Sequence, residues 1–232
     1  MMKKLYSNIL RTFAPGKSLL AIGLTVMAFR ASATPVTVQE LGVGANEVVE
    51  MTSSTLGQHW VYAGILNLSV NGVATDGFCI DPFHWSISGP QAYNTEPLAN
   101  APKSPVNGMG AASALKIEQL WGHFYAHDMS NQDAAGLQIA IWEIVGGVDF
   151  HLDSAPDYGA GSMLDWVNSN PNASAASLIA VTGVGQDYVI PNLGGNDREI
   201  PNAPDGGQTA ILLGAGLAAL AIMRSRFVGA KA

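Results

Sequence analysis

The sequence predicts an α+β fold: a β-rich sandwich or barrel body with a helical insertion between Cys79 and Gln138. An N-terminal signal helix and a short C-terminal transmembrane helix are expected to flank this body. The prediction depends on alternating apolar residues with a hairpin turn in the first half, apolar stripes of helical period in the middle, and short β-branched segments after them. Strands, then helices, then strands again are typical of an α+β domain.

Residues 1–33 are predicted to be a secretory signal peptide. Basic residues precede an apolar stretch at 18–29, and Ala31-Ser32-Ala33 offers a cleavage site before Thr34. An uncleaved membrane anchor is the alternative, although the apolar stretch is short for a membrane-spanning helix. The segment therefore predicts an exported protein.

Three strands are predicted in the first half of the mature chain, at residues 36–41, 60–70 and 73–80. The second has the clearest alternation of apolar side chains. Asn71-Gly72 predicts a two-residue hairpin turn between the second and third strands. Cys79 is therefore expected near the end of a core strand.

Helices and closing strands are predicted in the second half. A loop over residues 86–110 precedes them, and Ser130 or Asn131 can cap the second helix, which Gly146-Gly147 ends. The predicted helices cover residues 111–129, 133–145 and 162–168, and the predicted closing strands cover residues 177–182 and 186–190. The folded domain is expected to span residues 34–192.

The C-terminal part is predicted to be a linker with a sorting motif, residues 193–207, followed by a transmembrane helix and basic tail, residues 208–232. The motif contains Pro204, Asp205, Gly206 and Gly207, and basic residues follow the apolar run. This arrangement resembles the VPDSG-CTERM and PEP-CTERM sorting tails of bacteria. The resemblance implies processing by signal peptidase and an exosortase-type protease, with inner-membrane anchoring before release to the cell envelope, surface or extracellular matrix.

Charge excludes one class of partner. Residues 34–208 contain all 18 acidic residues of the chain and three basic residues. A surface with a net charge of −15 repels nucleic acid. No cofactor is expected.

The single cysteine, Cys79, is a candidate to react with Gln138. A lone thiol in an exported protein cannot form an internal disulfide. Gln138 lies in a predicted helix that is apolar almost all round, so its amide must find partners. Either it bonds to loop backbone, or Cys79 attacks its carboxamide carbon, expels ammonia and leaves a thioester. A pocket with Phe78 and Trp142 would exclude water.

Two segments resemble the paired signatures of bacterial thioester domains, which are surface adhesin modules: Phe78-Cys79, and the stretch from Leu137 to Trp142 that contains Gln138. The resemblance implies an internal thioester between Cys79 and Gln138 that couples to a surface amine or hydroxyl on a protein or polysaccharide. One such event occurs per molecule, so the protein is not expected to be an enzyme. His84 is a candidate to assist proton transfer.

Two other classes of function stay open at this point. One is a non-covalent structural or matrix-binding surface protein with a free cysteine. The other is a Cys-His hydrolase that pairs Cys79 with His84, His123 or His151. His123 and His127 have a spacing that can present two imidazoles to a metal ion, although no metal site is expected.

Overall fold

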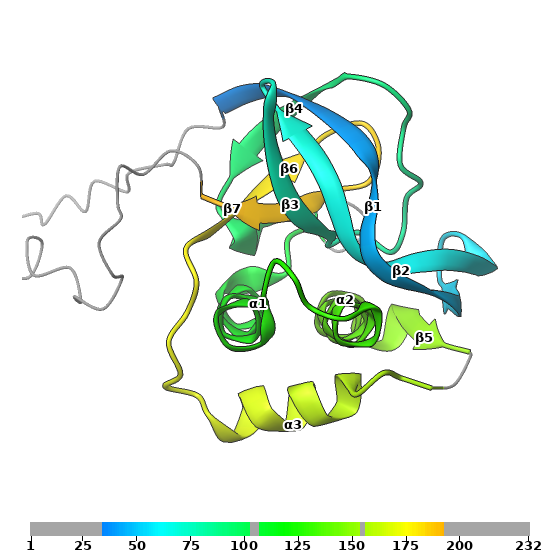
Figure 1. The fold of residues 1–232 in the computed structure, drawn as a ribbon, viewed down its shortest axis with the longest axis vertical. Helices are drawn as coiled ribbons and strands as arrows, with labels where there is room; N and C mark the ends of the chain where they lie inside the picture. Colours follow the sequence, from blue (N-terminus) through cyan, green and yellow to red (C-terminus); the bar gives the residue numbers. More distant parts are fainter. Residues whose placement is uncertain (1–33, 103–106, 154–155, 193–232) are drawn as a thin grey trace, which may run out of the picture. The chain divides into compact units, whose positions relative to one another are not determined.

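The computed structural model describes residues 34–102, 107–153 and 156–192 (Figure 1). The predicted signal peptide, sorting motif and C-terminal transmembrane helix lie outside these residues. Among the helices that the structure describes, none combines the length and the apolar character that a membrane crossing requires.

Seven strands, three α-helices and two short 3-10 helices make up the described part of the chain. In chain order they are β1 (Thr34–Ser53), β2 (Gly57–Val70), β3 (Val73–Cys79), β4 (Gln91–Glu96), η1 (Leu98–Asn100), α1 (Gly110–Phe124), α2 (Asn131–Gly146), η2 (Gly147–Asp149), β5 (Phe150–Leu152), α3 (Ala160–Ser169), β6 (Leu178–Thr182) and β7 (Tyr188–Pro191). The predicted β-rich body with helices is thereby confirmed.

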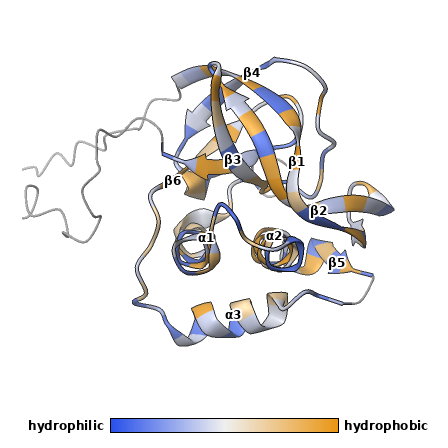
Figure 2. Cartoon of the chain, in the orientation of Figure 1, coloured by the Kyte–Doolittle hydropathy of each residue, from blue (hydrophilic) through white to orange (hydrophobic). Residues whose placement is uncertain are grey.

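The sheet closes on itself as an antiparallel barrel. Its strand order is β2-β3-β7-β6-β4-β1-β5, and β1 also pairs with β2. The long β1 makes closure possible, because its first residues pair with β4 while its later residues pair with β2 and β5. Apolar and polar residues alternate along the strands, as the two faces of a closed sheet require (Figure 2). Of the two bodies predicted, the structure has the barrel.

The β1–β2 hairpin continues past the barrel, and one face of β2 is open to solvent in this extension. Leu66 and Leu68 of β2 are buried inside the barrel, whereas Trp60 and Tyr62, on the same face of the strand, are more than half exposed. Gly64 lies between the two regions with φ of +152°, and a Cβ there would come within 2.2 Å of the Ala45 carbonyl oxygen. The same face of one strand is therefore core at one end and open at the other.

The helices form a layer against the barrel (Figure 1). Helix α2 contacts β1, β2 and β3 on one side and α3 on the other, and α1 lies beside α2. The Ser130 hydroxyl accepts from the Asp133 N–H at 3.1 Å, which caps α2 as predicted. At Gly136 a Cβ would lie 2.3 Å from the Tyr158 carbonyl oxygen, so glycine allows α2 to pack tightly against the chain before α3.

Several predicted boundaries differ from the structure. The first strand runs to Ser53 rather than stopping at residue 41, because pairing with β2 carries it across irregular positions between Glu40 and Asn46. The predicted loop 86–110 contains β4 and η1, and its last residue, Gly110, is the first residue of α1. Helix α1 ends at Phe124 rather than residue 129. Strand β5 was not predicted, since three residues carry too little pattern to recognise.

Candidate functional site

Cys79 and Gln138 are in contact, although they lie 59 positions apart in the sequence. The Cys79 N–H donates to Gln138 Oε1 at 2.9 Å, and Gln138 Nε2 donates to the Cys79 carbonyl oxygen at 2.8 Å. The carboxamide thus pairs with the backbone of the cysteine as a neighbouring strand would. This pairing satisfies one donor and one acceptor on each side, and only one orientation of the amide allows it.

Their placement follows from the elements that carry them. Cys79 is the last residue of β3, where pairing with β7 continues through Tyr188. Gln138 is on α2, whose middle is buried on every side, as the apolar sequence predicted. Both residues are nearly inaccessible to solvent, with exposed fractions of 3% for Cys79 and 1% for Gln138. The backbone N–H and C=O of the last residue of β3 therefore bond to a polar side chain of the buried helix α2.

A cavity of about 260 Å³ reaches both residues. Aromatic side chains surround it: Trp60 and Tyr62 from β2, Trp85 from the loop after β3, and Trp142 from α2. Trp60, Tyr62 and Trp85 each expose more than half of their surface. The remaining lining residues are Glu40, Val43, Met51, Leu56, His59, Val61, Leu66, Cys79, Pro82, His84, Ser86, Gln138 and Gln186. The Cys79–Gln138 pair therefore borders a cavity whose walls include four large aromatic side chains.

The Cys79 thiol is held in its neutral form. Burial is the main cause that raises its pKa, and the nearby charge of Asp81 raises it further. The Asp81 N–H donates to Cys79 Sγ at 3.3 Å, which opposes the shift without cancelling it. Because its pKa is raised, the thiol does not readily lose its proton to form a thiolate.

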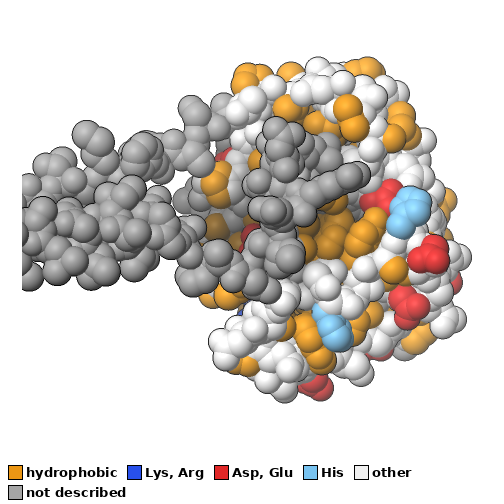
Figure 3. Space-filling model, turned by 60° about the vertical axis from the view of Figure 1, so that its left-hand side comes forward, with side chains coloured by type: hydrophobic (Ala, Val, Ile, Leu, Met, Phe, Trp, Pro, Cys, Tyr) orange, Lys and Arg blue, Asp and Glu red, His pale blue; other side chains and the backbone are white. Residues whose placement is uncertain are grey.

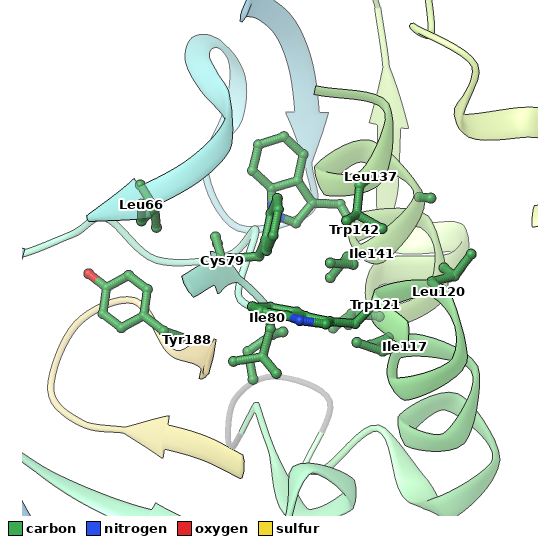
Figure 4. Packing of buried hydrophobic residues seen from close by; sticks show 14 of the residues in the cluster. Leu66, Cys79, Ile80, Ile117, Leu120, Trp121, Leu137, Ile141, Trp142 and Tyr188 are labelled. Atoms are coloured by element: carbon green, nitrogen blue, oxygen red, sulfur yellow. The ribbon is translucent and has the colours of Figure 1, made fainter. Parts of the chain in front are cut away.

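Trp142 covers the thiol. Figure 4 shows Trp142 and Cys79 within one cluster of buried side chains. The indole N–H is close enough to the sulfur to lower the pKa of the thiol, but it makes no well-formed hydrogen bond with any described residue. A buried N–H donor without a hydrogen-bond partner destabilises the folded state.

A carboxylate–histidine pair follows Cys79 in the chain. His84 Nδ1 lies 2.8 Å from Asp81 Oδ2, and Asp81 Oδ1 accepts from the Phe83 N–H at 3.0 Å. Burial raises the pKa of Asp81, while the hydrogen bond to His84 opposes this rise. The turn from Asp81 to His84 therefore holds the imidazole in the same cavity that Cys79 and Gln138 line. The sequence pattern indicated His84 but not Asp81.

The other predicted residues have different positions. Phe78 is fully buried on the opposite face of β3 and packs edge-on against Trp121 and Tyr125; it does not line the cavity. His123 stacks on Trp166 at 3.9 Å, whereas His127 bonds to Asp76 at 2.7 Å. Within the described ranges no group of three His, Cys, Asp or Glu side chains could hold a metal ion. His123 and His127 thus have separate partners.

The surface around the domain is acidic. Carboxylates are scattered over the face drawn in Figure 3, and almost no Lys or Arg side chain is visible there. None of the residues that line the cavity is a lysine or an arginine. This field favours neutral or cationic molecules near the cavity over anionic ones.

Comparisons with known proteins give structural matches only. No protein-family model matches the chain, and no curated protein matches it. Among solved structures, it is similar to the thioester domain of the Staphylococcus aureus TIE protein, with 15% identity, a TM-score of 0.39, and coverage of 75% of this chain and 80% of that one. It is also similar to the N-terminal thioester domain of a surface protein from Clostridium perfringens, with 10% identity, a TM-score of 0.39, and coverage of 63% and 99%.

Proposed function

We propose that this domain forms an internal thioester between Cys79 and Gln138 and uses it to attach the protein covalently to a partner. The observation that supports the proposal most directly is the reciprocal pairing of the Gln138 carboxamide with the Cys79 backbone. That pairing brings the residue with the only thiol of the chain next to a side-chain amide in a buried place. A shared cavity gives a nucleophile access to both.

The hydrogen bonds assign a role to each atom of the amide. The sulfur of Cys79 attacks Cδ of Gln138, and negative charge develops on Oε1, where the Cys79 N–H already donates. The C–N bond then breaks, the thiol proton passes to the departing nitrogen, and ammonia leaves. The product is a thioester whose carbonyl oxygen keeps the Cys79 N–H as a donor.

The surroundings favour a lasting thioester. Trp142 and the apolar side chains of α2 exclude water, which would hydrolyse it. A sulfur whose thiol has a raised pKa is a poor leaving group, which slows uncatalysed loss. An amine or hydroxyl that enters the cavity attacks Cδ, an amide or ester forms, and Cys79 regains its thiol. Each molecule reacts once, so the domain is not an enzyme.

The proposal includes export and attachment at the cell envelope. The predicted signal peptide would direct secretion, and the predicted tail, with Pro204 to Gly207, would anchor the chain until an exosortase-type protease acts. The partner would be an amine- or hydroxyl-bearing protein or polysaccharide of the surface or matrix. Support for this part comes from sequence patterns alone.

A Cys-His hydrolase is the second candidate, and the Asp81–His84 pair is the observation that favours it. A cysteine hydrolase needs an activated thiol, usually a thiolate paired with its histidine. Here burial and the neighbouring Asp81 act in the opposite direction and raise the pKa of Cys79. The hydrolase would also leave the pairing of Gln138 without a role. The thioester is therefore the better proposal.

Intact mass tests the proposal. The mature domain, purified after export, would be measured beside Cys79→Ala, Gln138→Ala and Gln119→Ala variants. Gln119 is a matched control because it is also a buried glutamine on a helix, with its side chain bonded to the backbone at Pro171 and Ala173. We expect a deficit of one ammonia in the wild type and in Gln119→Ala. We expect the full mass in the other two variants.

Methylamine gives the second readout. It should add its own mass to the deficient species and release one thiol. A fresh wild-type sample with the full calculated mass and a titratable thiol would contradict the thioester and leave a non-covalent surface module with a free cysteine. Repeated hydrolysis of an ester or amide by the wild type, lost in Cys79→Ala, would support the hydrolase instead.

A further inference from the structure

Acyl transfer out of the proposed thioester needs a route for a proton. The attacking amine or hydroxyl must lose a proton, and the sulfur of Cys79 must gain one. Burial and the charges of Asp81 and Asp187 make a bare thiolate unfavourable at this position. A group that accepts the first proton and donates the second would lower the barrier for both steps.

The cavity contains a side chain suited to this exchange. His84 lines the cavity together with Cys79 and Gln138, and its side chain keeps 38% of its surface exposed. Its Nδ1 is engaged by Asp81, which leaves Nε2 as the nitrogen available for proton transfer. Asp81 is itself fixed, since its side chain accepts from the Phe83 N–H and its own N–H donates to Cys79 Sγ. One short turn thus connects the sulfur, the carboxylate and the imidazole.

We propose that His84 is the proton carrier of acyl transfer and that Asp81 positions its ring. This inference rests on the proposed thioester. As the nucleophile attacks Cδ of Gln138, its proton passes to His84 Nε2. The C–S bond then breaks, and the imidazolium returns the same proton to Cys79 Sγ. The amide or ester and the neutral thiol are the only products, so atoms and charges balance.

Other groups at the cavity must be distinguished from His84. Glu40 and Tyr62 line it from β1 and β2, Asp187 lies near Cys79 and Asp81, and His59 contributes a second imidazole. His59 Nδ1 bonds to the Gly57 carbonyl oxygen, and its ring contacts Trp85 edge-on, so backbone rather than a carboxylate positions it. His59 is therefore a matched control within the same cavity.

The test measures the rate of methylamine addition to the purified thioester protein as a function of pH. Rates are divided by the concentration of unprotonated methylamine, so that the titration of methylamine itself does not contribute to the pH profile. For the wild type we expect the rate to depend on pH through a single ionisation. His84→Gln should lose about 100-fold in rate and lose this ionisation, whereas His59→Gln should keep both.

Asp81→Asn provides a readout that a merely structural role would not move. Asparagine keeps an oxygen for the ring but removes the charge that favours imidazolium, so the rate profile should shift to lower pH. Wild-type rate and profile in His84→Gln, or a larger loss in His59→Gln, would overturn the assignment of His84 while the mass deficit remains. Absence of the deficit in the wild type would instead overturn the thioester, and the inference with it.

Discussion

Two buried glutamines on neighbouring helices have opposite surroundings. Gln119 on α1 is 2% exposed and donates from Nε2 to the carbonyl oxygens of Pro171 and Ala173, at 3.0 and 3.1 Å. Gln138 on α2 is 1% exposed and exchanges two hydrogen bonds with Cys79. The first connects a helix to a loop. The second pairs its amide with the backbone of the residue that carries the thiol.

The comparison shows that burial of an amide does not by itself indicate chemistry. Both glutamines satisfy the requirement that buried polar groups find partners. Gln138 differs because its partner carries a nucleophile, its oxygen accepts from the backbone of that same residue, and a cavity opens onto both. The expected function therefore depends on what the amide meets.

Removal of the apolar cover over the Cys79–Gln138 pair should have the largest effect. Trp142→Ala is expected to cost about 3–5 kcal/mol of unfolding free energy and to admit water to the thioester. Trp142→Phe keeps most of the ring and removes the unpartnered N–H, so it should cost much less. Urea unfolding and the rate at which the mass deficit disappears measure both effects. Equal stability of the two variants would contradict this account of Trp142.

A carboxylate at position 138 should destabilise the domain by about 3 kcal/mol at pH 7, because it is buried and faces the Cys79 carbonyl oxygen. Burial would raise the folded-state pKa of the new Glu side chain in Gln138→Glu. The folded state would then bind its proton more tightly than the unfolded state. Stability should therefore be greatest below the ordinary pKa of about 4.3 and fall as pH rises through the folded pKa. Unfolding free energies of Gln138→Glu and Gln138→Ala, measured at several pH values, check the sign of this pH dependence.

Loss of the other amide should affect stability alone. Gln119→Ala removes both hydrogen bonds to the segment after α3 and leaves two carbonyl oxygens without this donor, at an expected cost of about 1–3 kcal/mol. The ammonia deficit should stay complete, because α1 does not supply the thioester. Thermal unfolding together with intact mass gives the result. A partial deficit would mean that the two glutamines are coupled through the packing of α1 on α2.

The smallest expected effect concerns the start of α3, which leads into the segment that Gln119 holds. Asp157 accepts from the N–H groups of Gly161 and Gly159, and these bonds lower its pKa. A lowered pKa stabilises the fold above the ordinary value, and this contribution is lost as pH falls through the folded pKa. Asp157→Ala should cost about 0.5–1 kcal/mol at neutral pH, since the side chain is exposed. The difference from wild type should shrink in acid, which unfolding curves at pH 7 and pH 3 would reveal.

The parts of the fold that were predicted well depend on local chemistry. Asn71 and Gly72 both have positive φ, as the predicted two-residue turn requires, and Val70 pairs with Val73 across it. Ser130 caps α2, and the apolar sequence of α2 makes it a buried helix. The strand beyond residue 41 was missed because its glycine-containing stretch has no alternation. Only pairing with β2 makes it a strand.

The candidate site divides in the same way. Cys79, Gln138, Trp142 and His84 could be named from residue type and spacing, and the structure brings all four to one cavity. Asp81 could not be named, because its role depends on the turn that directs its carboxylate to His84. Phe78 alternates with Cys79 along β3 and therefore faces the other way, into the core with Trp121.

The sequence by itself determined that this chain has one thiol, one glutamine in an apolar helix, an acidic mature region and patterned terminal segments. These are properties of residue type and of order along the chain. Only the tertiary structure decided that the barrel closes through β1 and that the end of β3 meets the middle of α2. It also decided that the extended hairpin opens a cavity onto that contact. The physical reason is that hydrogen bonds and packing between distant segments depend on the register and direction of whole elements, which local patterns do not specify.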